Sequence, residues 1–272
     1  MTQAISPTWY RIAIFAIPED RSELAEILAK TLSLLPTDAA IQARNLPGLV
    51  NGEFPLDAAR RATQALAELG LHAEAIPVDQ TPHLHPCETP HHLRWPAEGL
   101  EICGLSGEVE STVAWPNVEM ISVGQVPLES TMHHTDRKTT FVSAGRHHVP
   151  EGDSTARLAA GPEAWVVCRE PHRVLRLDHK RFNYEGLAER KTESATANFR
   201  QFLMELVARA QDAYLTPATM AFLTAEHAQK YSFASVTELE RSTLLHLLIR
   251  RSGRSAVMPS PNPTASTVPT SA

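Results

Sequence analysis

This chain of 272 residues has only three cysteines, Cys87, Cys103 and Cys168. Three cysteines at these spacings do not form the disulfide framework of a small secreted domain, so we expect a reducing compartment. No apolar run approaches the ~20 residues that a membrane helix needs, and no basic segment followed by an apolar core opens the chain. The sequence therefore predicts a cytoplasmic protein without a membrane span.

An excess of basic residues is also missing. Lysine and arginine number 25 against 31 aspartates and glutamates, which gives a formal net charge of −6. A chain of this sign does not attract nucleic acid through its overall field, so we expect no nucleic-acid partner. The hydrophobic fraction of 43% is ordinary for a globular protein, and the length suits about two domains.

Established catalytic motifs are absent as well. The sequence contains neither a P-loop nor a Gly-x-Gly-x-x-Gly turn, so no phosphate cradle of known type is predicted. It also lacks the Gly-x-Ser-x-Gly elbow and the kinase motif set. Histidine and aspartate side chains in one polar stretch remain candidates for an acid–base or metal site: His133, His134, Asp136, His147, His148 and Asp153.

The first 80 residues have the clearest pattern of structural elements. Trp9 to Ile17 is rich in apolar and β-favouring residues and predicts a strand. A helix follows, with Leu24, Leu28 and Leu32 among the residues of its buried stripe. A second helix is expected to begin at Thr37 as N-cap and to end at 47–48.

A third helix and a short strand complete this region. Pro55 suits the first helical position, and Gly70 is the expected left-handed residue after the helix. His72 to Ile76 then alternates as a strand, and Pro77 ends it. The predicted order is β-α-α-α-β, and we assign it to a domain over residues 9–77.

Three segments of this domain form a recognisable frame: Leu46-Pro47-Gly48, Asp57-Ala58-Ala59, and 69–74. With this frame the domain resembles the C-terminal domain of the ribosomal protein L7/L12 family. The ClpS adaptors share a similar fold. In the L7/L12 family, the segment corresponding to 34–42 meets translation factors, but here it lacks lysine and carries an acid. The resemblance implies an interaction surface, for which the candidate residues are Pro36, Thr37, Asp38 and Ile41.

Residues 78–96 are rich in proline and histidine and predict an extended linker. Imidazole and thiolate groups are good zinc ligands, although no CxxC or HExxH spacing is present. Two hypotheses stay open for this segment: a solvated linker, or a zinc site. The candidate ligands are His83, His85, Cys87, His91 and His92.

The middle of the chain changes to short strands, predicted at 100–105, 109–114, 118–123, 164–169 and 173–177. Ser194 then caps an amphipathic helix that carries Phe199 and Phe202. Small strands closed by one helix resemble a pleckstrin-homology-like domain of uncharacterised bacterial proteins, and we assign it to 97–212. Cys103 and Cys168 are expected in its core, while Trp115, Asn183 and Tyr184 either shape a ligand pocket or pack.

Residues 216–251 predict two further helices. Thr216-Pro217 opens the first, and the capping-box pair Ser235 and Glu238 opens the second. Leu244 and Leu248 lie on an apolar face that either binds a partner or packs on the body of the protein. Residues 252–272 are rich in proline, serine, threonine and alanine, and we expect them to be disordered.

The sequence as a whole predicts an α+β protein without a recognised catalytic constellation. The first functional hypothesis is an adaptor or scaffold that binds protein partners, with a translation-linked role as a special case. The alternatives are a zinc-binding protein that uses the histidine-rich segment, and an enzyme of unrecognised type. Stable protein partners would favour the adaptor, and bound zinc would favour the zinc-binding protein. A pocket formed by the paired histidines would favour the enzyme.

Overall fold

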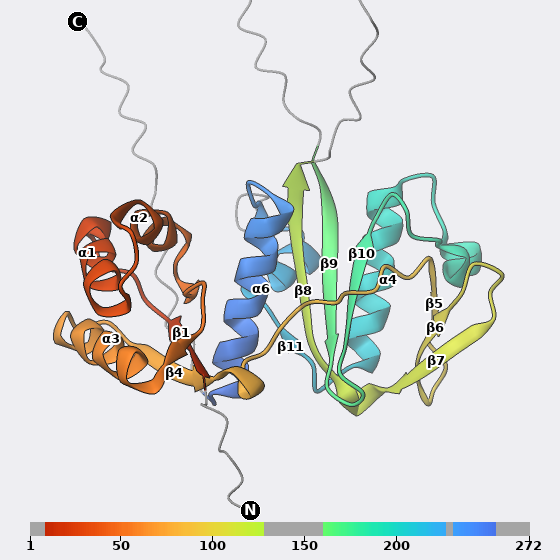
Figure 1. The fold of residues 1–272 in the computed structure, drawn as a ribbon. Coiled ribbons are helices and arrows are strands. Elements are labelled where there is room, and N and C mark those ends of the chain that lie inside the picture. Colours follow the sequence, from red (N-terminus) through yellow and green to blue (C-terminus); the bar gives the residue numbers. More distant parts are fainter. Residues whose placement is uncertain (1–8, 128–159, 227–230, 254–272) are drawn as a thin grey trace, which may run out of the picture. The chain divides into compact units, whose positions relative to one another are not determined.

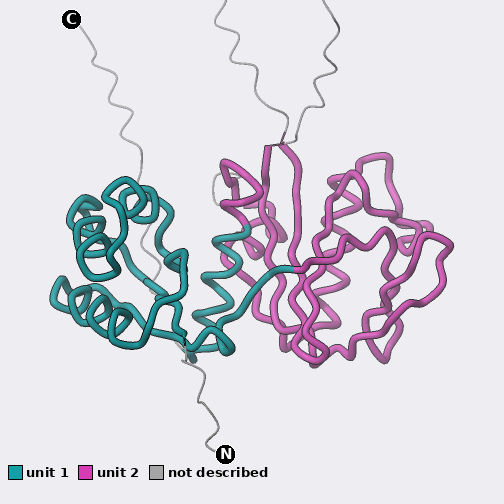
Figure 2. Tube along the Cα trace, viewed as in Figure 1, with its two compact units in different colours: residues 1–85, 240–272 teal, residues 86–239 magenta. Residues whose placement is uncertain are grey.

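The computed structural model describes residues 9–127, 160–226 and 231–253. Helices and small, mostly antiparallel sheets alternate along the chain, which confirms the mixed α+β class (Figure 1). The chain divides into two compact units, residues 1–85 with 240–272 and residues 86–239 (Figure 2). Within the described residues, no helix combines the length and the apolar character that crossing a membrane requires.

Unit 1 is built around the central strand β1. β1 pairs antiparallel with β2 and β3 on one side and with β4 on the other, and Ile12 lies opposite Ala75. The elements are β1 (Trp9–Ile14), α1 (Arg21–Leu32), α2 (Pro36–Asn45), β2 (Gly48–Leu49), β3 (Phe54–Pro55), α3 (Leu56–Glu68), β4 (Ala73–Pro77) and η1 (Val78–Gln80).

The core of unit 1 follows the predicted helical stripes. Leu24 and Leu28 of α1 and Leu66 of α3 are fully buried and pack with Ile12 of β1. Alanines on the inner faces of α2 and α3 allow close packing because their side chains are short. Gly70 has φ of 72° directly after α3, as predicted for the residue that ends a helix.

Two predicted helix starts are corrected by one or two residues. The N-cap of α2 is Leu35 and Pro36 is its first residue, so Thr37 lies inside the helix instead of capping it. Proline supplies the helical φ at the first position without losing a hydrogen bond, and this preference sets the start. Pro55 is the N-cap of α3 and also pairs with Trp9 in the sheet.

Unit 2 contains two sheets. β10, β9, β8 and β11 form one sheet in that order, with only β11 running parallel to its neighbour, and β5, β6 and β7 form the other. The elements are β5 (His92–Arg94), β6 (Gly99–Cys103), β7 (Val109–Ala114), η2 (Trp115–Asn117), β8 (Val118–Pro127), β9 (Ala160–Cys168), β10 (Arg173–Asp178), η3 (Glu185–Arg190), α4 (Ala195–Arg209), β11 (Tyr214–Leu215) and α5 (Pro217–Leu223).

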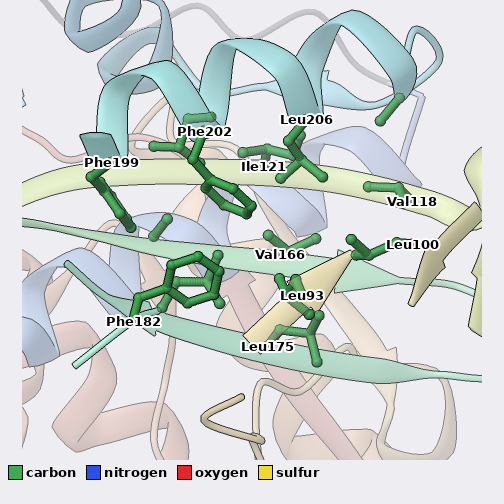
Figure 3. Packing of buried hydrophobic residues seen from close by; sticks show 14 of the residues in the cluster. Leu93, Leu100, Val118, Ile121, Val166, Leu175, Phe182, Phe199, Phe202 and Leu206 are labelled. Carbon is green, nitrogen blue, oxygen red and sulfur yellow. The ribbon is translucent and has the colours of Figure 1, made fainter. Parts of the chain in front are cut away.

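The core of unit 2 lies between α4 and the strands. Phe199, Phe202 and Leu206 point from α4 toward the sheet residues Val166 and Leu175 (Figure 3). All five side chains are at most 1% exposed. At roughly 1.5–3 kcal/mol for each fully buried large apolar side chain, this contact is a main source of stability for unit 2.

Helix caps in unit 2 confirm the predicted starts. The Ser194 hydroxyl accepts a hydrogen bond from the Ala197 amide at the start of α4, and Thr216 accepts from the Thr219 amide in α5. α6 (Val236–Arg251) begins after Ser235, whose hydroxyl accepts from the Glu238 amide at 3.1 Å. The first residues of α6 belong to unit 2, and those from 240 onward belong to unit 1.

The segment 78–96, predicted as a solvated linker, is instead built into the structure. Leu84 and Leu93 are 2% and 0% exposed, and β5 lies within this segment. The Glu88 amide donates to the Val174 carbonyl of β10, and the Glu88 carbonyl accepts from the Arg176 amide. Backbone pairing with distant strands overrides the solvated, extended form that the proline content suggests.

Candidate functional site

The predicted interaction residues at the start of α2 lie on the surface of unit 1. Ile41 is 55% exposed, and the preceding Leu35, which is not among the predicted interaction residues, is 67% exposed, whereas Ala39 and Ala43 of α2 are buried. Leu35 is the N-cap of α2, and the exposed Asp38 and Ile41 lie three and six residues after it, in the first two turns of the helix. The structure therefore presents an apolar surface interrupted by one carboxylate, which we call the α2 surface: Leu35, Pro36, Thr37, Asp38 and Ile41.

Hydrogen bonds hold α2 in place behind this surface. The Gln42 side chain donates to the Asn51 carbonyl at 3.2 Å and accepts from the Asn51 amide at 2.9 Å. The Arg21 guanidinium donates to the Arg44 carbonyl at 2.7 Å near the end of the helix. These contacts fix both the loop after α2 and its last turn, so the exposed residues are carried on a supported helix.

The other predicted interaction residues lie on α6 and are less accessible. Leu248 is 3% exposed, and Leu244 is partly buried. Arg241 of the same helix donates a hydrogen bond to the Asn45 side chain, and Glu240 lies 2.7 Å from a ring nitrogen of His85. In this structure α6 is a packed helix, and Leu248 does not contribute to an open surface.

The five predicted zinc ligands are not gathered into one site. Within the described part of the chain, no group of three or more histidine, cysteine, aspartate or glutamate side chains is placed to hold a metal ion. His83 and His85 fall in unit 1, and Cys87, His91 and His92 fall in unit 2. His92 is part of β5, opposite Cys103, and burial lowers its pKa.

The structure also contains a polar pocket that the sequence patterns did not indicate. It is a cavity of about 280 Å³ in unit 2, near the ends of β8, β9 and β10. Charged side chains from two strands and the following turn line it, and apolar residues of β8 complete the wall. We call it the strand-end pocket; its charged and imidazole groups belong to Glu163, Arg176, Asp178, His179, Lys180 and Arg181.

An ion pair forms one wall of the strand-end pocket. The Arg176 Nε donates to one Glu163 carboxylate oxygen at 2.7 Å, and its Nη2 donates to the other at 3.0 Å. These hydrogen bonds raise the pKa of Arg176. The guanidinium also lies 6.0 Å from the centre of the Trp165 ring. The two hydrogen bonds hold the Arg176 guanidinium and the Glu163 carboxylate in a fixed orientation.

A buried histidine forms the second wall. The His179 ring lies against Gly161, where a Cβ would approach its Cε1 to 2.0 Å, so only glycine leaves room for this ring position. Burial lowers the pKa of His179, although the neighbouring Asp178 opposes the change. The imidazole is therefore neutral at pH 7. The Tyr184 hydroxyl donates to the His179 carbonyl at 2.6 Å and fixes the backbone behind it.

The rim of the strand-end pocket carries the remaining charges. The Asp178 carboxylate accepts from the Lys180 amide at 2.9 Å and lies 3.6 Å from the Arg181 Nε. The Lys180 side chain is exposed and makes no ion pair with any described residue. Three cations and two carboxylates thus line the pocket, which leaves one positive charge in excess in a chain of net charge −6.

Sequence reasoning missed these residues because strand pairing brings them together. Register places Asp178 opposite Glu163 and Arg176 opposite Trp165, and none of these pairs is visible as a motif. One signal was present: four consecutive polar or charged residues, Asp178 to Arg181, follow the apolar part of β10. Such a cluster at a strand end could have been named as a candidate site.

The other candidate residues have structural contacts or lie outside the described residues. The Trp115 indole donates to the Pro96 carbonyl at 3.1 Å, and the Asn183 side chain accepts from the Glu185 amide at 2.8 Å. Cys103 and Cys168 are buried in strands, as predicted. The paired histidines and their neighbouring acids fall within 128–159, outside the described residues.

No family model, no curated protein and no solved structure matches this chain.

Proposed function

We propose that this chain is a non-catalytic adaptor that binds a protein partner through the α2 surface. The observation that carries the proposal is the exposure of two large aliphatic side chains, Leu35 at 67% on the N-cap of α2 and Ile41 at 55% within this supported helix. Asp38 between them adds a carboxylate. The matching partner surface has an apolar groove for the two side chains and a basic residue that meets the acid.

The core of unit 1 does not need these side chains. Leu32 of α1 and two alanines of α2, Ala39 and Ala43, already face inward and are buried. A single exposed leucine is ordinary in a soluble protein, but two large aliphatic residues around an acid on one helix form a small patch. Residues near the centre of an interface, where the partner excludes water, contribute most of the free energy of binding, and we expect Leu35 and Ile41 to take that place.

The proposal includes a finer architecture and a cellular setting. The order β1, α1, α2, β2, β3, α3, β4 supports an L7/L12-like fold for unit 1, and a sheet packed against α4 supports a pleckstrin-homology-like fold for unit 2. In the first resemblance, the α2 region is where translation factors bind, so a translation-linked partner is a special case of the proposal, although this segment carries an acid and no lysine. All three cysteines are free, as expected in the cytoplasm.

The test is a quantitative affinity capture from the organism that encodes the chain, with three forms of the full-length protein. The first is the wild type, and the second carries Leu35→Ser and Ile41→Glu. Serine is a good N-cap residue, so the change at position 35 removes apolar surface without weakening α2. The third is a control, Leu105→Ser, which removes a leucine that is 86% exposed in unit 2.

We expect a defined set of proteins with the wild type and the control, and a loss of about tenfold or more with the double variant. A tenfold loss corresponds to about 1.4 kcal/mol, which is less than the removal of two contact residues can cost. Equal capture by all three forms would show that the α2 surface is not used. No enrichment over background with any form would refute the adaptor proposal.

A further inference from the structure

The strand-end pocket of unit 2 has the features of a binding site and lies outside the proposed α2 surface. Its volume of about 280 Å³ is close to the lower end of the range for small-molecule sites, about 300–1,000 Å³. Most of its polar groups come from strands and a tight turn, so the backbone holds them in place. A site on such supports is better ordered than one on long loops.

The ion pair in its wall indicates a polar occupant. The Glu163 side chain is only 6% exposed, whereas its partner Arg176 is 37% exposed and opens toward the cavity. Desolvating a carboxylate costs several kcal/mol, and a well-packed apolar pair often serves stability as well or better. A buried acid that orients a guanidinium at the edge of a cavity is therefore better explained by recognition of a polar ligand than by stability.

The distribution of charge indicates the sign of that occupant. Glu163 is matched by Arg176, and Asp178 is close to Arg181, so the Lys180 ammonium is the cation left without a partner among the described residues. His179 is neutral and adds no charge that would repel either sign. An excess cation beside oriented donors attracts an anion, and a compact ammonium binds carboxylate or phosphate as a point charge.

We propose that the strand-end pocket binds a small anionic metabolite, with its oxyanion against Lys180 and Arg181 and its polar body along the Glu163–Arg176 pair. Carboxylate and phosphate groups share this chemistry. The cavity admits a small polar molecule, and the neutral imidazole of His179 provides a hydrogen-bonding wall. The inference is independent of the adaptor proposal, since the pocket lies in unit 2 and the α2 surface lies in unit 1.

The test is a titration of the full chain, labelled with ¹⁵N, with two probes at constant ionic strength. One probe is inorganic phosphate and the other is succinate, with sodium chloride adjusted so that general screening stays fixed. The readout is the set of backbone amide shifts of Gly161, Glu163 and residues 178–181. Two variants are compared with the wild type: Lys180→Ala at the pocket, and Lys191→Ala, an exposed lysine of unit 2 outside the pocket, as the control.

We expect saturable shifts at these amides, with a Kd of about 1 mM or below for at least one probe. The Lys180→Ala variant should bind at least about tenfold more weakly, and the Lys191→Ala variant should bind like the wild type. A response to phosphate alone identifies a phosphate ligand, and a response to succinate alone identifies a carboxylate ligand. The proposal is overturned if neither probe gives saturable shifts, or if the Lys180→Ala variant binds as tightly as the wild type.

Discussion

Replacing Thr219 by valine should destabilise unit 2, because one buried hydroxyl joins α5 to β8. The Thr219 Oγ1 accepts from the Val123 amide at 2.9 Å and donates to the Ile121 carbonyl at 2.9 Å. It also lies 2.8 Å from the Thr216 hydroxyl. A hydroxyl has a single proton, so Thr216 is the donor in this last contact. Thr219 itself is 0% exposed.

The magnitude follows from these contacts. Valine has nearly the shape of threonine but leaves the Val123 amide and the Thr216 hydroxyl without their acceptor. An unsatisfied buried polar group costs about 1–3 kcal/mol, so we expect Thr219→Val to lower the free energy of unfolding by about 2–3 kcal/mol. Thr219→Ser keeps the hydroxyl and loses one methyl group, which costs about 1 kcal/mol.

Urea unfolding followed by tryptophan fluorescence measures the difference, since Trp95, Trp115 and Trp165 all lie in unit 2. Hydrogen exchange of the 118–127 peptide gives a local readout at β8. We expect the stability order wild type, Thr219→Ser, Thr219→Val, and faster exchange in β8 for the valine variant. A valine variant at least as stable as the serine variant, with unchanged exchange, would refute the reasoning.

Two further predictions concern titratable groups. Burial raises the pKa of the Cys168 thiol to about 12. At pH 8 we therefore expect a thiol reagent to label the partly exposed Cys87 first, and Cys168 only after denaturation. Labelling of Cys168 in the native protein would contradict this. Burial lowers the pKa of His246 from 6.5 to about 4. Between these pH values the unfolded chain binds more protons than the folded chain. The free energy of unfolding should therefore fall by up to about 3 kcal/mol as the pH drops from 6.5 to 4. His246→Gln should flatten that part of the profile of unfolding free energy against pH, and an unchanged slope would show that His246 is not the cause.

Local signals were the part of the fold that the sequence predicted well. Ser194 and Thr216 cap α4 and α5 as expected, and Gly70 follows α3 with a positive φ. In each case a side chain or a backbone angle within a few residues decides the outcome. The start of α2 was misplaced for the same kind of reason, because Pro36 and Thr37 are both good starting residues and proline took the first position.

Long-range pairing was the part that composition could not predict. The proline-rich segment 78–96 looked like a linker, yet Glu88 forms backbone hydrogen bonds with Val174 and Arg176. The partners are more than 80 residues away in the sequence, and no periodic pattern predicts such a pairing. The third contact of Glu88, the ion pair with Arg173, depends on the same register and was equally invisible.

The two candidate sites differ in the same way. The α2 surface depends on neighbours along one helix, so Ile41 could be named from the sequence and was found exposed. The strand-end pocket depends on the β9–β10 register, which places Glu163 opposite Asp178, and on the turn that brings His179 over Gly161. Proximity in the sequence could indicate the charged turn 178–181, but it could not show that Asp178 lies opposite Glu163, fifteen residues earlier.

The most direct test of the adaptor proposal is site-specific photo-crosslinking in the organism that encodes the chain. A photoreactive phenylalanine analogue is placed at Ile41, and at Leu105 in the control, because both side chains are exposed and neither change removes a core contact. The proposal predicts a discrete protein adduct at position 41 that is absent at position 105. No adduct at position 41, or the same adducts at both positions, would contradict the claim that the α2 surface binds a protein partner.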